Sequence, residues 1–159
     1  MDKQALISQL ALSPHPEGGY FRRTYESGQV QRGRKLMSSI YYLLTDDQPT
    51  GHLHRNHSDI VHYWQHGSPL TYSLLSPAGK LLQFTLGPDL ANGQQLQLTV
   101  PGGFWKASQL LCGSYGLISE AVCPGFDCDD HEMAAAAAIR EQYPQHWPTL
   151  KPLCRTGTL

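Results

Sequence analysis

The sequence predicts an all-β-dominated fold, an antiparallel sandwich or barrel with one short helix at each end. Short runs rich in Tyr, Val, Ile, Leu and Thr follow one another, and segments rich in Gly, Pro, Asn and Asp separate them. No long helical pattern lies between these runs, which favours antiparallel sheets. The 159 residues contain no internal repeat or linker, so we expect a single domain over residues 1–159.

Nine runs have the composition expected of β-strands. Each run alternates or clusters apolar residues and ends at a turn signal such as Pro-Gly-Gly. We therefore expect one strand from each run. They cover residues 19–27, 38–45, 51–55, 59–66, 70–76, 80–87, 94–100, 104–110 and 114–122.

Helical patterns occupy the two ends of the chain. Near the N-terminus, apolar residues from Ala5 to Leu12 follow helical spacing until Pro14, which would end a helix. Near the C-terminus, residues 127–144 begin with acidic side chains, continue through a run of alanines and reach Pro144. We expect an alanine-rich helix there, with carboxylates at its positive end and Pro144 as its stop.

The overall charge argues against nucleic acid and membrane partners. Twelve basic and 13 acidic side chains leave a formal charge of −1, so no electrostatic footprint for nucleic acid is present. No apolar run approaches the roughly 18 residues of a membrane helix. The four cysteines lack paired zinc spacing and the N-terminus lacks a signal-peptide pattern, so we expect a cytoplasmic protein with reduced thiols.

Five of the eight histidines lie in residues 51–67. On a strand, His52 and His54 are two positions apart and would point to the same face, where two imidazoles can bind one transition metal. Asp59 is the expected third ligand, and His57 competes for that place. Two hypotheses stay open: a metal site at His52, His54 and Asp59, or a pocket where the histidines serve as hydrogen-bonding or acid-base groups with no tightly bound metal.

Two further residues are candidates for acid-base chemistry beside His54. Tyr63 shares the strand phase of Asp59, so we expect it in the pocket, with His62 and His66 on the opposite, surface-facing side. Glu120 has two equally weighted placements. Facing the barrel interior it would be a general base whose pKa burial raises, and facing outward it would simply be solvated.

The ligand-binding candidates come from two strands. Tyr20, Arg22 and Thr24 form one alternating set in which a planar guanidinium could hold a carboxylate or phosphate; a solvated strand face is the alternative. Lys106 would bring an ammonium to the pocket mouth or lie outside, and Trp105 would form an aromatic wall or pack. An ammonium and an indole are not metal ligands at neutral pH, so neither completes a metal site.

The sequence resembles the cupin superfamily. Gly51, His52, His54, a carboxylate near position 59 and Gly67 resemble the first cupin motif, and Pro101 with Gly103 resembles the second. The similarity is closest to the DUF985 family, also called Cupin 5. It is carried by the segments 15–27, 38–45, 51–64, 100–107 and 124–133.

This resemblance implies a double-stranded β-helix, or jelly roll, that forms a homodimer. It also implies a small polar ligand in the barrel, such as a sugar, a nucleotide-sugar or a carboxylate, with acid-base chemistry of the epimerase or isomerase type. The alternatives are a non-catalytic binding protein and a metal-dependent oxygenase or isomerase that uses His52, His54 and Asp59. The second-motif histidine falls on Lys106, so the four-ligand metal site of other cupins is not reproduced by these motifs.

Overall fold

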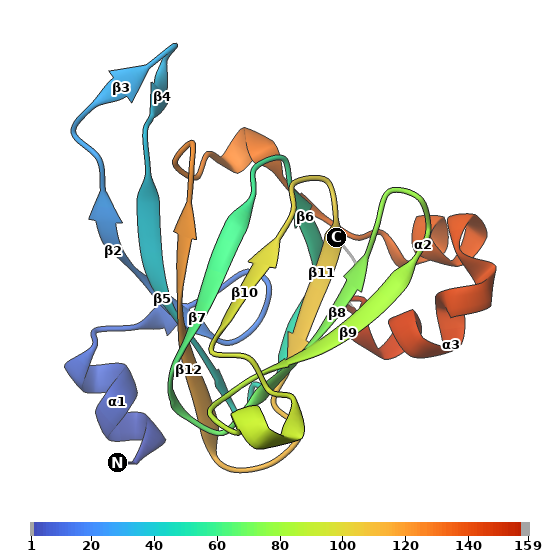
Figure 1. Cartoon of the computed structure of the whole chain (residues 1–159), viewed down its shortest axis with the longest axis horizontal. Coiled ribbons are helices and arrows are strands. Elements are labelled where there is room, and N and C mark those ends of the chain that lie inside the picture. Colours follow the sequence, from blue (N-terminus) through green and yellow to red (C-terminus); the bar gives the residue numbers. More distant parts are fainter. Residues whose placement is uncertain (1, 157–159) are drawn as a thin grey trace.

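Two antiparallel β-sheets face each other in the computed structural model, which describes residues 2–156 (Figure 1). The first sheet has six strands in the order β1 (Ser13–Pro14), β2 (Tyr20–Glu26), β5 (Ser38–Thr45), β12 (Tyr115–Val122), β7 (Ile60–Gly67) and β10 (Gln97–Val100). The second has five strands in the order β13 (His131–Met133), β6 (Thr50–Asn56), β11 (Trp105–Gln109), β8 (Leu70–Leu75) and β9 (Leu81–Leu86). Strands that are distant in sequence are neighbours in both sheets, as expected for a jelly roll.

All nine strand-like runs form strands, so the predicted β-sandwich is confirmed. A small hairpin of β3 (Val30–Gln31) and β4 (Arg34–Lys35) extends beyond the first sheet (Figure 1). The short 3₁₀ helices are η1 (Leu90–Asn92), η2 (Cys128–Asp130), η3 (Pro144–His146) and η4 (Lys151–Leu153). Within residues 2–156, no helix is both long enough and apolar enough to span a bilayer.

Helices cover the outer faces of the two sheets. Helix α1 (Lys3–Gln9) packs Leu6 against Leu43 and Leu117 of the first sheet. Helices α2 (Ala136–Gln142) and α3 (Trp147–Leu150) cover the second sheet, where Ile139 and Leu150 are almost fully buried (Figure 1). The predicted helices at the two ends of the chain are thus present.

The C-terminal helix begins later than predicted. Residues 131–133 form strand β13, which pairs with β6 so that His131 lies opposite Asn56 and Met133 opposite His54. Hydrogen bonding to the sheet therefore replaces the helical turn that the alanine-rich pattern suggested. The first turn of α2 has no acidic residue, so the expected carboxylates at its positive end are wrong, whereas its end before Pro144 is as predicted.

The space between the sheets holds both an apolar core and a charged region. The apolar part includes Leu44, Leu70, Leu86 and Ile118, each fully buried. Buried ionisable side chains occupy the rest of this space: Glu17, His54, His62 and Lys106. Burying charged groups is costly unless they are paired, so this region of the barrel is the place to look for function.

Candidate functional site

A cavity of about 60 Å³ opens between the sheets, next to the charged region. A second, smaller hollow of about 10 Å³ adjoins it and shares His54, Asn56, Ile60 and Glu120 with it. The polar side chains that line the larger cavity include Glu17, Arg23, His54, Asn56, Glu120 and His131. A space of this size holds a few water molecules or the reactive end of a small organic molecule.

A β-bulge in β6 separates the two histidines that were expected to share one face. Lys106 pairs with His54 and Ser108 pairs with Gly51, so β6 has one residue more than β11 over this stretch. The extra residue breaks the two-residue period of the strand. His54 is 6% exposed and lines the cavity, whereas the Nδ1 atom of His52 lies 2.8 Å from the backbone oxygen of Glu17.

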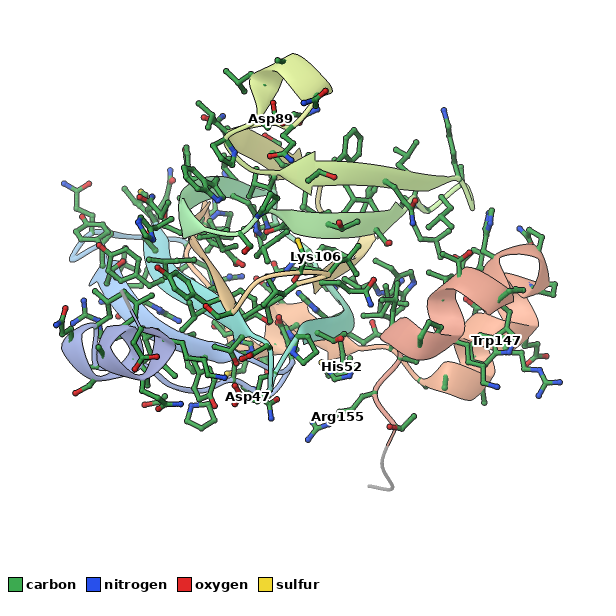
Figure 2. All side chains as sticks on the ribbon, turned by 90° about the horizontal axis from the view of Figure 1, so that it is seen from below. Asp47, His52, Asp89, Lys106, Trp147 and Arg155 are labelled. Atoms are coloured by element: carbon green, nitrogen blue, oxygen red, sulfur yellow. The ribbon has the colours of Figure 1, made fainter. Side chains whose placement is uncertain are left out.

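Figure 2 labels His52 and Lys106, the residue that pairs with His54. Lys106 lies in the middle of the molecule in this view, and His52 lies below it. The expectation that His52 and His54 point into one pocket is therefore wrong. Asp59, the expected third metal ligand, does not face the cavity either. Its carboxylate accepts a hydrogen bond of 2.7 Å from the Gly102 backbone N–H in an exposed turn.

Instead, His54 meets a carboxylate and a second imidazole, and we call Glu17, His54 and His131 the outer triad. Glu17 Oε1 lies 3.2 Å from His54 Nε2 and 2.9 Å from His131 Nε2. The two imidazole rings stack with their centroids 5.2 Å apart. The outer triad therefore has the composition of a two-histidine, one-carboxylate metal site, and its potential ligand atoms all lie within 4.8 Å of one another.

The charge states of the outer triad follow from burial and pairing. Burial alone would raise the pKa of Glu17, but the positive charge that His54 carries at acid pH and a hydrogen bond from His131 lower it to about 2. Burial lowers the pKa of His54 to about 4. At neutral pH, Glu17 is therefore a carboxylate and His54 a neutral imidazole.

Deeper in the barrel lies a second set of charged side chains, which we call the inner group: Glu120, His62, Lys106 and Tyr72. Glu120 and His62 are directly opposite each other on β12 and β7, with His62 Nδ1 3.3 Å from Glu120 Oε1. The Tyr72 hydroxyl lies 3.2 Å from the same His62 nitrogen. Lys106 Nζ lies 3.9 Å from Glu120 Oε1 and 5.5 Å from the centroid of the Tyr72 ring.

Two members of the inner group bear on the sequence predictions. The placement of Glu120 was left open, and His62 was expected on the surface. Glu120 faces the interior, where burial alone would raise its pKa but the charges of His62 and Lys106 hold the pKa well below its ordinary value. His62 was expected on the surface and is 1% exposed, so that expectation is wrong. The inward set on β7 is Ile60, His62 and Trp64, which places Tyr63 on the outer face.

Strand phase also separates the expected ligand-binding residues from the cavity. On β2 the inward set is Phe21 and Arg23, both of which line the cavity. Tyr20 packs in the cluster under α1, and the Arg22 guanidinium lies 5.8 Å from the Tyr41 ring. The structure therefore does not bring Tyr20 and Arg22 to the cavity.

Thr24 and Trp105 lie away from the cavity as well. Thr24 is exposed at an irregularity in the pairing of β2 with β5. Trp105 is buried against the C-terminal helices, with the Arg55 guanidinium 4.4 Å from its ring centroid. Of the two neighbours on β11, only Lys106 faces the interior, because successive side chains of a strand alternate between its faces.

A family comparison agrees with this architecture. The family model described as "Cupin superfamily (DUF985)" matches residues 4–134, which is most of the chain. The chain belongs to the cupin superfamily. This cupin is 40% identical to uncharacterized protein YML079W of Saccharomyces cerevisiae over 147 residues, which covers 80% of this chain and 73% of that protein.

Solved structures place this cupin among proteins of the same shape. Protein SO0799 from Shewanella oneidensis has a TM-score of 0.94 at 35% identity and 99% coverage of both chains. A hypothetical protein from Leishmania major has a TM-score of 0.90 at 31% identity, covering 97% of this chain and 99% of that one. Oxalate decarboxylase from Bacillus subtilis, with a TM-score of 0.58 at 14% identity over 92% of this cupin and 37% of that chain, shares the fold alone.

Sequence reasoning missed several ionisable residues that line the two hollows of this cupin, including His15, Glu17, Arg23, His62 and His131. Glu17 and His131 lie within two of the segments that carry the family resemblance, 15–27 and 124–133, so their membership of these segments was a signal that the sequence offered. Arg23 and His62 were missed for another reason, because each was assigned to the outer face of its strand.

Proposed function

We propose that this cupin binds a small polar organic molecule in its barrel and catalyses a proton transfer next to a carbonyl group, as epimerases and isomerases do. In this proposal His62 is the general base, Glu120 positions it, and Lys106 stabilises the negative charge that develops on the substrate oxygen. His54 and Arg23 contact the polar ends of the ligand. The non-catalytic binding protein is the alternative.

The single observation that carries the proposal is the free nitrogen of a buried, oriented imidazole. His62 Nε2 is buried and has no hydrogen-bond partner among residues 2–156. Its other nitrogen, Nδ1, faces the carboxylate of Glu120 at 3.3 Å. A carboxylate only accepts hydrogen bonds, so we assign the proton to Nδ1 and a lone pair to Nε2.

A neutral histidine oriented by a carboxylate is the usual arrangement of a general base. Burial lowers the pKa of His62, so its imidazole is neutral at physiological pH and able to accept a proton. When His62 takes a proton from the carbon next to a carbonyl, the electron pair moves to the carbonyl oxygen. The imidazolium then delivers the proton to the neighbouring carbon, which completes an isomerisation. An epimerisation needs in addition a second acid on the opposite face of the enolate, which protonates the same carbon from that side.

Two cations are placed to stabilise and hold such a ligand. The Lys106 side chain is only 4% exposed and its ammonium lies beside Glu120, so it can stabilise an enolate oxygen in a region of low dielectric constant. Arg23 lines the cavity, and its Nε is buried without a partner in the described chain. A free guanidinium N–H favours a carboxylate or another oxyanion on the ligand.

Deuterium incorporation tests this function. Small 2-oxo acids and keto-sugars are incubated with the protein in D₂O, and loss of the proton next to the carbonyl is followed by NMR. We expect His62→Gln to slow the exchange by about 10²-fold or more while ligand affinity changes little. His66→Gln is the matched control, because His66 lies on the same strand and is exposed.

The alternative has its own outcome. A ligand that binds without any exchange, with His62→Gln and His54→Ala affecting only affinity, would establish a binding protein. Two related predictions are independent of catalysis: a cytoplasmic location and a homodimer. Light scattering after gel filtration tests the homodimer, for which the unpaired edges of β9 and β10 supply a physical motive.

A further inference from the structure

We propose that the outer triad of Glu17, His54 and His131 binds one divalent transition-metal ion, such as Zn²⁺, Mn²⁺, Fe²⁺ or Co²⁺. The site differs from the metal site that the cupin motifs suggested, because it uses neither His52 nor Asp59. It also goes beyond the proton-transfer proposal, which concerns the inner group and needs no metal.

The spacing of the three side chains fits a single ion. Metal-nitrogen and metal-oxygen bonds are about 2.0–2.2 Å, so neighbouring ligand atoms around one ion lie roughly 3–3.5 Å apart. Glu17 Oε1 lies 3.2 Å from His54 Nε2 and 2.9 Å from His131 Nε2. The three potential ligand atoms therefore need only small shifts to surround a metal.

The hydrogen bond on the far side of His54 gives a second, independent argument. Its Nδ1 lies 2.7 Å from the backbone oxygen of His52. A carbonyl oxygen only accepts, so Nδ1 carries the proton and Nε2 carries a lone pair that faces the Glu17 carboxylate. The His54 Nε2 lone pair and the Glu17 carboxylate are both acceptors and repel each other. A cation bound to both of them would remove this repulsion. This backbone contact is also the usual outer-shell support of a metal-binding histidine.

The backbone around the outer triad holds its members in place. The backbone oxygen of Glu17 accepts a hydrogen bond of 2.7 Å from the His52 N–H. His131 is held by the pairing of β13 with β6, opposite Asn56. Two segments that are far apart in sequence are therefore fixed to one strand, β6, on which the third ligand, His54, lies. A preorganised site of this kind loses little conformational entropy on binding an ion.

The test measures metal binding alone. Full-length protein without an affinity tag is stripped with EDTA, and Co²⁺ binding is followed by visible absorption and Zn²⁺ binding by calorimetry. We expect one ion per chain and a higher unfolding temperature with metal. Glu17→Gln and His131→Gln should each weaken binding at least tenfold, whereas His57→Ala, which removes an imidazole whose side chain is 70% exposed, should not.

Several results would overturn the metal site. Stoichiometry well below one, unchanged affinity in both triad variants, or an equal loss in His57→Ala would show that binding is absent or occurs on the surface. Circular dichroism checks that each variant is folded, and the two triad variants are alternatives if one is not. His62→Gln should slow the exchange by about 10²-fold or more and retain Co²⁺ binding, so the metal proposal and the proton-transfer proposal can fail separately.

Discussion

The inner group and the outer triad are two charged clusters in one barrel, and they are built in different ways. Glu120 and His62 pair directly across neighbouring long strands, and Lys106 comes from the facing sheet. In the outer triad, only His54 lies on a long strand. Glu17 comes from the loop before β2, and His131 comes from the short strand β13 after the barrel.

This difference has consequences for stability and for ligand binding. The side chains of the inner group are held by the hydrogen-bonded ladders of the sheets, so removing one of them leaves a buried partner with little freedom to adjust. The outer triad depends on two segments attached to β6. We therefore expect the inner group to dominate stability and the outer triad to respond mainly to bound ions. The following predictions test that contrast, from the largest expected effect to the smallest.

Replacing Glu120 should have the largest effect. Glu120→Ala leaves the Lys106 ammonium buried without its counter-charge, and we expect a loss of about 3–5 kcal/mol in the free energy of unfolding. Urea unfolding measures it. The double variant Glu120→Leu/Lys106→Met should recover a substantial part of the loss, since neither charge then remains buried. A loss below about 1 kcal/mol for Glu120→Ala would remove the distinction between the two clusters.

A substitution at Gly51, beside the bulge in β6, tests how tightly the barrel interior packs against this strand. A Cβ atom at Gly51 would lie 2.5 Å from the Tyr42 hydroxyl and 2.6 Å from Ser108 Oγ, both of them inside the barrel. We expect Gly51→Ala to lower the free energy of unfolding by about 1–3 kcal/mol through overpacking. Gly28→Ala is the control, because no atom lies within 4 Å of a Cβ placed there. Equal unfolding midpoints for Gly51→Ala and Gly28→Ala would show that the interior can accommodate a side chain at position 51.

Two adjacent arginines test strand phase at the cavity. Arg23 lines the cavity and Arg22 lies over Tyr41 on the opposite face. If the ligand has an oxyanion, Arg23→Gln should weaken its binding about tenfold, which corresponds to about 1.4 kcal/mol. Arg22→Gln should leave affinity unchanged within a factor of two to three. Equal losses in calorimetric titrations would show that the ligand does not sit where the geometry places it.

The pH dependence of stability gives the smallest expected effect. Burial lowers the pKa of His62 from its ordinary value of 6.5, so just below that pH the unfolded chain binds more protons than the folded chain. Stability should therefore fall as the pH drops from about 7.5 to about 5.5. The groups that face His62 are Glu120, Lys106 and Tyr72.

Unfolding free energies at the two pH values measure this contribution. In His62→Gln the titrating imidazole is absent, so the decrease on acidification should be smaller than in the unmodified protein. Glu120 acts in the same direction at lower pH, since its pKa is also held below the ordinary value and its stabilisation is lost on protonation. An identical decrease in both proteins would show that the pKa of His62 does not differ between the folded and the unfolded chain.

Much of the fold could be predicted from local patterns. Nine of the thirteen strands in the described chain, their approximate limits and the leading helix follow from residue composition and turn signals, which act over a few neighbouring residues. The candidate site was predicted in part. His54, Glu120 and Lys106 line the barrel, whereas His52, Asp59 and Tyr63 lie outside it.

By itself, the sequence determined the β-rich architecture and the presence of an imidazole-rich strand, because spacing and composition are properties of the chain alone. Only the tertiary structure decided which set of alternating residues faces inward on β2 and β7, where both sets mix apolar and polar side chains. It also decided the bulge that turns His52 away, and the pairing of β13 with β6 that brings His131 to Glu17. These features depend on contacts between segments far apart along the chain, and a period of two residues carries no information about them.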